Sequence, residues 1–160
     1  MRSLKTFRMA ALAWLLLTLV GLGHAGDLAW FSADVAGRLQ GCGSCPRDAG
    51  FAPSFAQRVA WWREQAGPNG IWVDAGGFLV GPDTLASRGK VMVAAYNAAG
   101  VRAAHVTSAD LWMGLQPSLE ALESAQFPRF SANLFDAESS ERLFDPFVVL
   151  DLAGERLAVL

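Results

Sequence analysis

Histidine is scarce in this sequence of 160 residues, which contains only His24 and His105. Imidazole nitrogens are common ligands of transition metals, and a site that loses one of its ligands usually loses the ion. His24 lies in an N-terminal segment that we expect to be removed, so the rest of the chain has a single imidazole. This scarcity argues against a histidine-rich metal centre. We interpret His105, which lies in a strand-like segment, as a strand residue rather than a ligand.

Charged residues are also few, at 18% of the chain, whereas apolar residues make up 52%. Such a composition can bury a core, which excludes a disordered chain, and the length suits one domain. Lys and Arg number 13 against 15 Asp and Glu, and Arg2, Lys5 and Arg8 precede the first acidic residue, Asp27. The remainder is therefore acidic, and we expect no binding to nucleic acid through a basic surface.

The sequence lacks an apolar run of the ~20 residues that a membrane-spanning helix needs. Residues 9–20 form a shorter apolar stretch, which follows the basic residues and precedes small residues up to Ala25. This is the pattern of a secretory signal peptide. We expect cleavage after Ala25, with residues 26–160 as one domain in the periplasm or secreted. The alternative is an uncleaved signal, which would then be the only contact with the membrane.

Only two cysteines are present, Cys42 and Cys45, separated by two residues. Thiols persist poorly in an oxidising compartment, so an exported chain is expected to join them in a disulfide. The same spacing occurs in redox pairs, in which the first thiol has a lowered pKa, and metal ligation is a third alternative. Pro46 and Gly50 extend a loop where a redox site would begin a helix, and this context favours the structural disulfide.

Strand-like and helix-like segments alternate along the rest of the chain. The patterns predict strands at 28–33, 70–75, 101–107 and 130–133, and helices that begin at Ala52, Leu85 and Ser118. The first helix is predicted to have Pro53 in its first turn and to end before Gly67. The second is predicted over 85–99, with a cap at Asp83 and Thr84 and a stop at Gly100, and the third over 118–126. Residues 146–152 and 156–160 are predicted to form a hairpin.

This alternation predicts an α/β layered domain with parallel strands, whose chemistry lies in loops beyond the carboxyl ends of the strands. Those loops begin at Asp34, Gly76 and Thr107. Asp74, at the end of the second strand, is expected to hold the loop that follows it. Trp61 and Trp62 cannot both face one side of a helix, so we expect one in the core and the other against a partner or against the missing half of the domain.

Several short segments carry a resemblance to a known family: 30–37 (WFSADVAG), the Cys-Gly loop, 50–58, 71–79 (IWVDAGGFL), 106–111 (VTSADL) and 131–134 (SANL). In matching order, they resemble the opening half of the exported bacterial 5′-nucleotidases and UDP-sugar hydrolases, including a branch that contains selenoproteins. These enzymes are calcineurin-like metallophosphoesterases. The resemblance implies a four-layer αββα sandwich, of which only the first half is expected here, and two divalent metal ions for the hydrolysis of phosphate esters.

Most metal ligands implied by the resemblance are absent from this chain. Asp34 retains the first Asp, and Asp110 retains the acid of the third motif. The replaced ligands are two His, at Ala36 and Ala109, a metal-bridging Asp, at Gly77, and an Asn, at Ser108. We therefore expect no bound cofactor, and the two acids are vestigial site residues. Their structural alternatives are loop stabilisation by Asp34 and capping of the turn at 111–114 by Asp110.

These observations predict an exported, catalytically degenerate metallophosphoesterase-like domain that serves as a binding or scaffold module. Its expected partner is an envelope protein or a small phosphorylated ligand. A first alternative is a thiol–disulfide redox protein that uses Cys42 and Cys45. A second is part of a phosphate-ester hydrolase whose remaining ligands lie beyond this chain.

Overall fold

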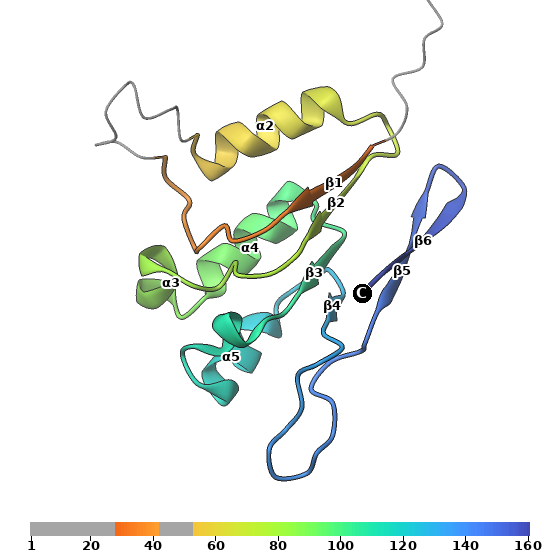
Figure 1. The fold of residues 1–160 in the computed structure, drawn as a ribbon. Helices are drawn as coiled ribbons and strands as arrows, with labels where there is room; N and C mark the ends of the chain where they lie inside the picture. Colours follow the sequence, from red (N-terminus) through yellow and green to blue (C-terminus); the bar gives the residue numbers. More distant parts are fainter. Residues whose placement is uncertain (1–27, 42–52) are drawn as a thin grey trace, which may run out of the picture.

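A four-stranded parallel sheet forms the centre of the computed structural model, which describes residues 28–41 and 53–160. Its strands lie in chain order, as the alternation of elements predicted, with Ala29 paired to Ile71 and Val73 to Ala103 (Figure 1). The strands are β1 (Ala29–Ser32), β2 (Ile71–Asp74), β3 (Ala103–His105) and β4 (Arg129–Phe130). The expected signal peptide and both cysteines lie outside the described residues.

Helices cover one face of this sheet (Figure 1). Their inner faces and the sheet bury an aromatic core in which the Tyr96 ring stacks on Phe78 at 4.8 Å and on Phe55 at 5.5 Å between centroids. In the described ranges, no helix is long and apolar enough to cross a membrane. The helices are α2 (Phe55–Gln65), α3 (Pro82–Ser87), α4 (Lys90–Ala99), the 3-10 helix η2 (Ser108–Leu111) and α5 (Leu115–Leu122).

An antiparallel hairpin of β5 (Val148–Leu152) and β6 (Glu155–Val159) covers the other face, where Leu150 packs on a second apolar cluster that includes Val73. Ala153 and Gly154 turn the chain with φ of 54° and 87°, which is the backbone that a tight hairpin requires. The hairpin and the layered α/β class are confirmed. The described residues form three layers of the expected sandwich: helices, parallel sheet and hairpin (Figure 1).

The prediction of one helix over 85–99 is wrong, because α3 ends and α4 begins within it. Arg88 and Gly89 both have left-handed backbone, with φ of 49° and 80°, which no continuous helix contains. A Cβ at Gly89 would lie 2.9 Å from the Cβ of Ala121 in α5. Close packing on α5 therefore accompanies the break, and the predicted cap residues Asp83 and Thr84 lie inside α3.

The start of α2 also differs from the prediction. Ser54 is the N-cap, so Pro53 precedes the helix and does not lie in its first turn. The Ser54 hydroxyl accepts from the Gln57 N–H at 3.3 Å, and the Gln57 side chain accepts from the Ser54 N–H at 2.9 Å. This reciprocal capping box provides acceptors for two N–H groups that have no partner within the helix.

Other boundaries shift by a few residues. Helix α5 begins at Leu115 and ends at Leu122, and β4 contains two residues, so both are shorter than the predicted 118–126 and 130–133. The expectation that one tryptophan of the pair packs against the core is confirmed. Trp62 packs against the core, whereas Trp61 is 48% exposed and meets the edge of Trp30 with ring centroids 4.8 Å apart.

Candidate functional site

The loops after β1, β2 and β3 meet at the carboxyl edge of the sheet. The Asp34 N–H donates to the Gly76 carbonyl and the Ala36 N–H donates to the Gly77 carbonyl, both at 2.8 Å. The Gly77 N–H in turn donates to the Asp110 carboxylate at 2.9 Å. Because parallel strands end at one edge, segments that are more than 30 residues apart in the sequence form one cluster there.

Asp110 is fully buried, and both of its carboxylate oxygens accept hydrogen bonds from the protein. Oδ2 accepts from the N–H of Gly77, the N–H of Thr107 and the hydroxyl of Thr107, at 2.9, 2.9 and 2.7 Å. Oδ1 accepts from the Leu79 N–H at 2.8 Å. These donors compensate for burial of the carboxylate. They also use the oxygens with which Asp110 would bind a metal ion.

The predicted cap at 111–114 is therefore wrong. Asp110 lies within η2, and Thr107 is the N-cap of that helix. Asp110 completes the capping box from inside and ties the loop after β3 to the loop after β2.

Asp74 is a second buried carboxylate at this edge. It accepts from the Ser32 hydroxyl at 2.5 Å, the Tyr96 hydroxyl at 3.0 Å and the Gly76 N–H at 2.8 Å. The last bond confirms that Asp74 holds the loop that follows it. Burial raises the pKa of Asp74 to about 6, because desolvation outweighs the hydrogen bonds from Ser32, Gly76 and Tyr96 that favour the anion.

Asp34 differs from the two buried acids because it is exposed. Its backbone is left-handed, with φ of 51°, and Ala36 two residues later has φ of 53°. A Cβ at Gly77, whose φ is 75°, would lie 3.2 Å from the Cα of Asp34. The loops after β1 and β2 thus approach each other closely at Gly77, and an aspartate at position 77 would be strained.

His105 is half-buried at the end of β3, consistent with its interpretation as a strand residue. Its Nδ1 lies 3.2 Å from the carbonyl oxygen of Ala75, and its Nε2 lies 3.4 Å from the Ser131 hydroxyl. The Ser131 hydroxyl is buried and donates to the Asn133 side chain at 3.2 Å. The imidazole thus joins β3 to the loops after β2 and β4.

Sequence reasoning did not identify two groups of residues near this edge. One is the pair Ser32 and Tyr96, whose hydroxyls donate to Asp74. Tyr96 is the only tyrosine in the sequence and lies in an apolar helical segment, which could have indicated a buried hydroxyl that needs a hydrogen-bond partner. The other is the pair Arg38 and Arg58. Both line a cavity of about 250 Å³ beside Asp34, together with Val35, Gln40, Gly41 and Pro53.

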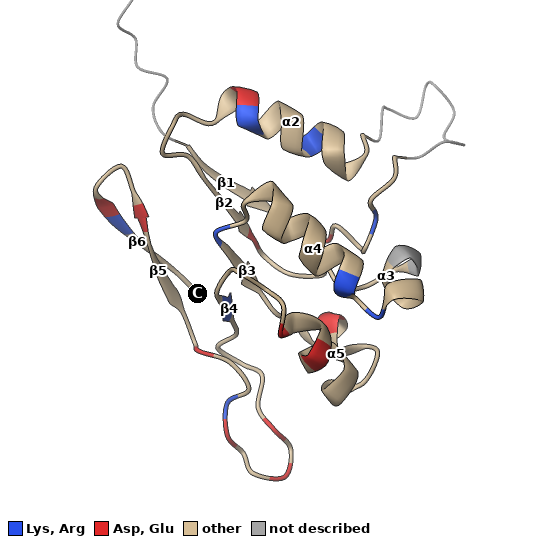
Figure 2. Cartoon of the chain, turned by 180° about the vertical axis from the view of Figure 1, so that it is seen from behind, with Lys and Arg blue, Asp and Glu red and all other residues tan. Residues whose placement is uncertain are grey.

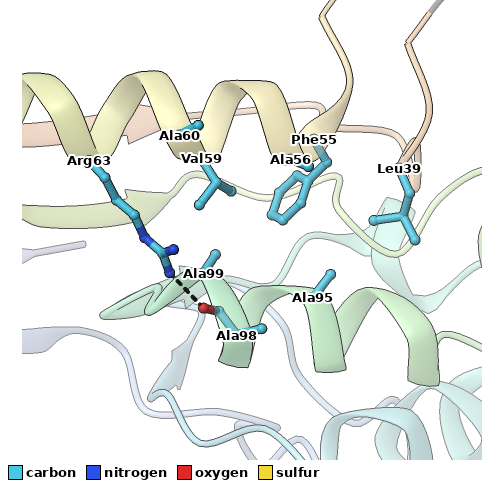
Figure 3. Close-up of a pocket in the computed structure, with 9 residues that line it drawn as sticks. All are labelled: Leu39, Phe55, Ala56, Val59, Ala60, Arg63, Ala95, Ala98 and Ala99. Carbon is cyan, nitrogen blue, oxygen red and sulfur yellow. Dashed lines mark hydrogen bonds between the residues drawn. The ribbon is translucent and has the colours of Figure 1, made fainter.

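A separate cleft of about 420 Å³ lies between α2 and α4, and its lining is almost entirely apolar. Figure 3 shows Phe55, Val59 and several alanines along its walls, with Arg63 at one end, where its guanidinium donates to the Ala98 carbonyl at 2.9 Å. Among the lining residues, only Leu39 comes from a strand-end loop, the one after β1, and its side chain is apolar. The cleft therefore contributes no acid, base or nucleophile to the candidate site.

The two divalent ions implied by the family resemblance do not fit the described residues. Asp74 and Asp110 are occupied by protein donors, and Ala36, Gly77 and Ala109 supply no ligand. In the part of the chain that the structure describes, no three His, Cys, Asp or Glu residues are grouped to hold a metal. Divalent metals need several such ligands at once.

No protein-family model matches the sequence, and no curated protein does either. Among solved structures, the chain is similar to the sulfate thiohydrolase SoxB of Thermus thermophilus, with a TM-score of 0.61 and 20% identity over 70% of this chain and 22% of that one. It is similar to a 5′-nucleotidase precursor from the same organism, with a TM-score of 0.60 and 24% identity over 80% of this chain and 26% of that one.

The calcineurin-like phosphoesterase YfkN of Bacillus subtilis is also similar, with a TM-score of 0.55 and 20% identity over 81% of this chain and 44% of that one. The chain thus spans less than half the length of each of these structures. The parallel sheet and its helical layer have a metallophosphoesterase-like, 5′-nucleotidase-like fold.

Proposed function

We propose that this chain is a binding module with a metallophosphoesterase-like fold that does not hydrolyse phosphate esters through two metal ions. One observation carries the proposal: the buried carboxylates at the carboxyl edge accept hydrogen bonds from the chain itself. Asp34 is the exposed acid that remains among the motif positions. Two-metal hydrolysis needs a bridging ligand and several others to hold both ions and activate water.

The alternative of a hydrolase completed by residues beyond this chain is less well supported. Such residues would have to replace the bridging carboxylate, for which Gly77 offers no side chain. They would also have to compete with the donors that now occupy Asp110. Removing those donors would leave buried N–H groups without partners, at a cost of roughly 1–3 kcal/mol each.

The proposal includes export and the absence of a nucleic-acid partner. The N-terminal pattern of basic, apolar and small residues supports export. Lys and Arg are distributed over α2, the start of α4 and the hairpin rather than gathered on one element (Figure 2). A nucleic-acid surface would concentrate them on one face or along one helix.

Metal analysis and a phosphatase assay on the full chain test this function. We expect well under one equivalent of Mn, Fe or Zn per chain, and no turnover of an aryl phosphate above that of Asp34→Asn. The assay includes added Mn²⁺, so that loss of metal during purification cannot mimic the result. Stoichiometric metal, with turnover abolished by Asp34→Asn, would contradict the proposal.

The spacing of Cys42 and Cys45 supports a second candidate, thiol–disulfide exchange. A structural disulfide should have a reduction potential below about −300 mV, whereas oxidoreductase pairs lie at roughly −270 to −120 mV. We expect the lower value, because Pro46 and the glycines around the pair predict a loop rather than the start of a helix. A potential in the higher range, with insulin reductase activity lost in Cys42→Ser, would favour the redox function.

A further inference from the structure

We infer that a cavity beside β4 binds the terminal carboxylate of a peptide that ends in an apolar residue. The cavity has a volume of about 400 Å³ and lies between β4 and the segment that leads into β5. It shares no lining residue with the loops after β1, β2 and β3 that form the candidate site. The inference rests on the proposed function, because it names a ligand that the chain binds and does not hydrolyse.

The cavity forms where the chain returns to the edge of the parallel sheet after a long loop (Figure 1). Phe130 of β4 pairs with Asp145 in a parallel bridge, and the Ser131 N–H donates to the Asp145 carbonyl at 2.8 Å. The structure describes every residue from β4 to the end of this segment. The lining consists of Arg129 from β4 and of Arg142, Leu143, Phe144, Asp145 and Pro146 from the returning segment.

The first observation is the charge of this lining. Arg129 is half-buried, whereas Arg142 and Asp145 are exposed. Two guanidinium groups against one carboxylate leave a net charge of +1, which a single negative charge balances. Asp145 would repel the second charge of a dianion. The charge balance therefore favours a carboxylate over a doubly charged anion.

The second observation is that Arg142 is oriented but not neutralised. Its Nη1 donates to the Ala132 carbonyl at 2.9 Å, and its guanidinium carbon lies 4.9 Å from the centre of the Phe135 ring. Both partners are uncharged. The contacts leave Nε and Nη2, the adjacent pair of donors that can form two parallel hydrogen bonds with one carboxylate.

Arg129 supplies a second donor that is already fixed in place. Its Nη1 donates to the Leu122 carbonyl at 2.6 Å, which ties the guanidinium to the end of α5. Its Nε is buried and has no hydrogen-bond partner among the described residues, so Nη2 is the nitrogen left for a ligand. An anion beside this partly buried cation would offset the cost of removing its charge from water.

The third observation is the apolar part of the lining, formed by Leu143, Phe144 and Pro146. All three are half-buried and present part of their surface to the cavity. The terminal carboxylate of a peptide is bonded to the Cα that carries the last side chain, so a carboxylate on the arginines places that side chain against this surface. The cavity volume also falls within the range of about 300–1,000 Å³ that is typical of ligand pockets.

Calorimetric titration of the full chain with short peptides tests the inference. Acetyl-Ala-Ala-Leu with a free carboxylate should bind saturably. Its C-terminal amide should bind about tenfold more weakly or worse, because it lacks the charge that the arginines recognise. Serine in place of the last leucine should weaken binding about fivefold, because less apolar surface is buried.

Three further ligands distinguish a peptide end from other sources of an anion. Acetyl-leucine represents a free acylated amino acid, the amide of acetyl-Ala-Glu-Ala an acidic side chain, and inorganic phosphate a dianion. Each should bind more weakly than the peptide acid. Acetyl-leucine fills less of the cavity, the glutamate carries no apolar group beyond its stem, and phosphate meets the repulsion of Asp145.

Variants of the lining provide the second measurement. Arg129→Gln and Arg142→Gln should each raise the Kd for the peptide acid about tenfold, and Arg142→Lys, which keeps the charge but lacks the paired donors, about fivefold. Asp145→Asn removes the like charge and should lower this Kd about two- to threefold. The matched control is Arg156→Gln, which removes an exposed arginine of β6 outside the cavity and should leave the Kd unchanged.

Thermal melting shows whether each variant is folded. Arg129 holds the end of α5, whereas Arg142 is exposed, so the two Arg142 variants remain informative if Arg129→Gln unfolds.

Absence of saturable binding, or equal binding of the peptide acid and its amide, would overturn the inference. An equal loss in Arg156→Gln and Arg142→Gln would also overturn it, because general attraction to positive charge would then explain binding. Phosphate or acetyl-leucine that binds as tightly as the peptide acid would overturn the assignment of a peptide end. Metal-dependent turnover of an aryl phosphate would instead contradict the proposed function, so the two failures are distinguishable.

Discussion

At the scale of single residues, the two acids retained in the motifs have different surroundings. Asp110 is buried and accepts bonds from two neighbouring loops, whereas Asp34 is exposed on a left-handed turn. The carboxylate of Asp110 therefore stabilises the edge of the sheet. That of Asp34 stays accessible beside Arg38 and Arg58.

This difference predicts unequal effects on stability. Asp110→Asn replaces an acceptor oxygen with a donor NH₂, which leaves buried N–H groups without partners, and should lower the free energy of unfolding by about 2–4 kcal/mol. Asp34→Asn keeps a residue that tolerates left-handed backbone and should change it by less than about 0.5 kcal/mol. Urea denaturation measures both. Equal effects would show that the bonds to Asp110 carry no special stability.

The buried Asp74 predicts a pH dependence of stability. Its pKa is raised to about 6 in the folded chain, against 3.8 for an unperturbed group, chiefly by desolvation. The folded state thus binds this proton more tightly than the unfolded state. Its stabilising contribution is fully present below pH 3.8 and is lost as the pH rises through 6. The difference of about two pKa units corresponds to roughly 3 kcal/mol.

Asp74→Asn replaces the carboxyl group with an amide that does not titrate. It should therefore flatten the plot of unfolding free energy against pH between pH 3.8 and 6. Glu138→Gln, on an exposed loop, removes one carboxylate elsewhere and should leave that slope intact. Denaturant unfolding at several pH values compares the two variants. An unchanged slope in Asp74→Asn would assign the pH dependence to other groups.

At the scale of elements, α3 and α4 show how packing divides a helical pattern. Gly89 and Gly100 have the same φ of 80°, but their surroundings differ. A Cβ at Gly89 would meet Ala121 at 2.9 Å and Leu79 at 3.2 Å, whereas a Cβ at Gly100 would meet nothing within 4 Å. The break between α3 and α4 therefore allows α4 to approach α5 closely.

Alanine at the two glycines separates backbone strain from packing. Gly100→Ala should cost about 1–2 kcal/mol, the strain of left-handed backbone alone. Gly89→Ala should cost a further ~1–3 kcal/mol because its methyl group also collides with α5 and Leu79. Chemical denaturation measures the difference. Equal losses would show that the contact with Ala121 relaxes without cost.

At the scale of the whole molecule, the hairpin packs on the second face of the sheet. Leu150 is 6% exposed and packs with Ile71, Val73 and Phe130, whereas the neighbouring Val149 points the other way and is 40% exposed. Helices bury one face of the sheet, and the hairpin packs on the other face over β2, β3 and β4 (Figure 1). At the edge strand β1 that second face stays open, since Phe31 is 55% exposed.

This packing predicts that the hairpin is part of one cooperative unit. Leu150→Ala should lower the free energy of unfolding by about 2–4 kcal/mol, because it opens a cavity against the sheet. Val149→Ala, on the outward face, should cost less than about 1 kcal/mol. Both variants should unfold in a single transition. Melting of the hairpin without loss of stability in the sheet would show that it is an independent element.

The sequence by itself determined the order of strands and helices, the hairpin and the helix stop at Gly100. These features depend on periodicity and turn residues within a few positions. It likewise determined which motif ligands are missing, since Ala36, Gly77 and Ala109 lack donor side chains whatever the fold.

Only the tertiary structure decided which acids remain accessible and which side chains meet. Asp110 accepts from residues 31 and 33 positions away, Asp74 bonds to Ser32 42 positions away, and Arg38 and Arg58 line one cavity from a loop and a helix. At the split between α3 and α4, Gly89 likewise lies against a distant residue, Ala121. Local patterns carry no information about such partners, because contacts across the sheet edge arise only when the parallel strands bring separate loops together.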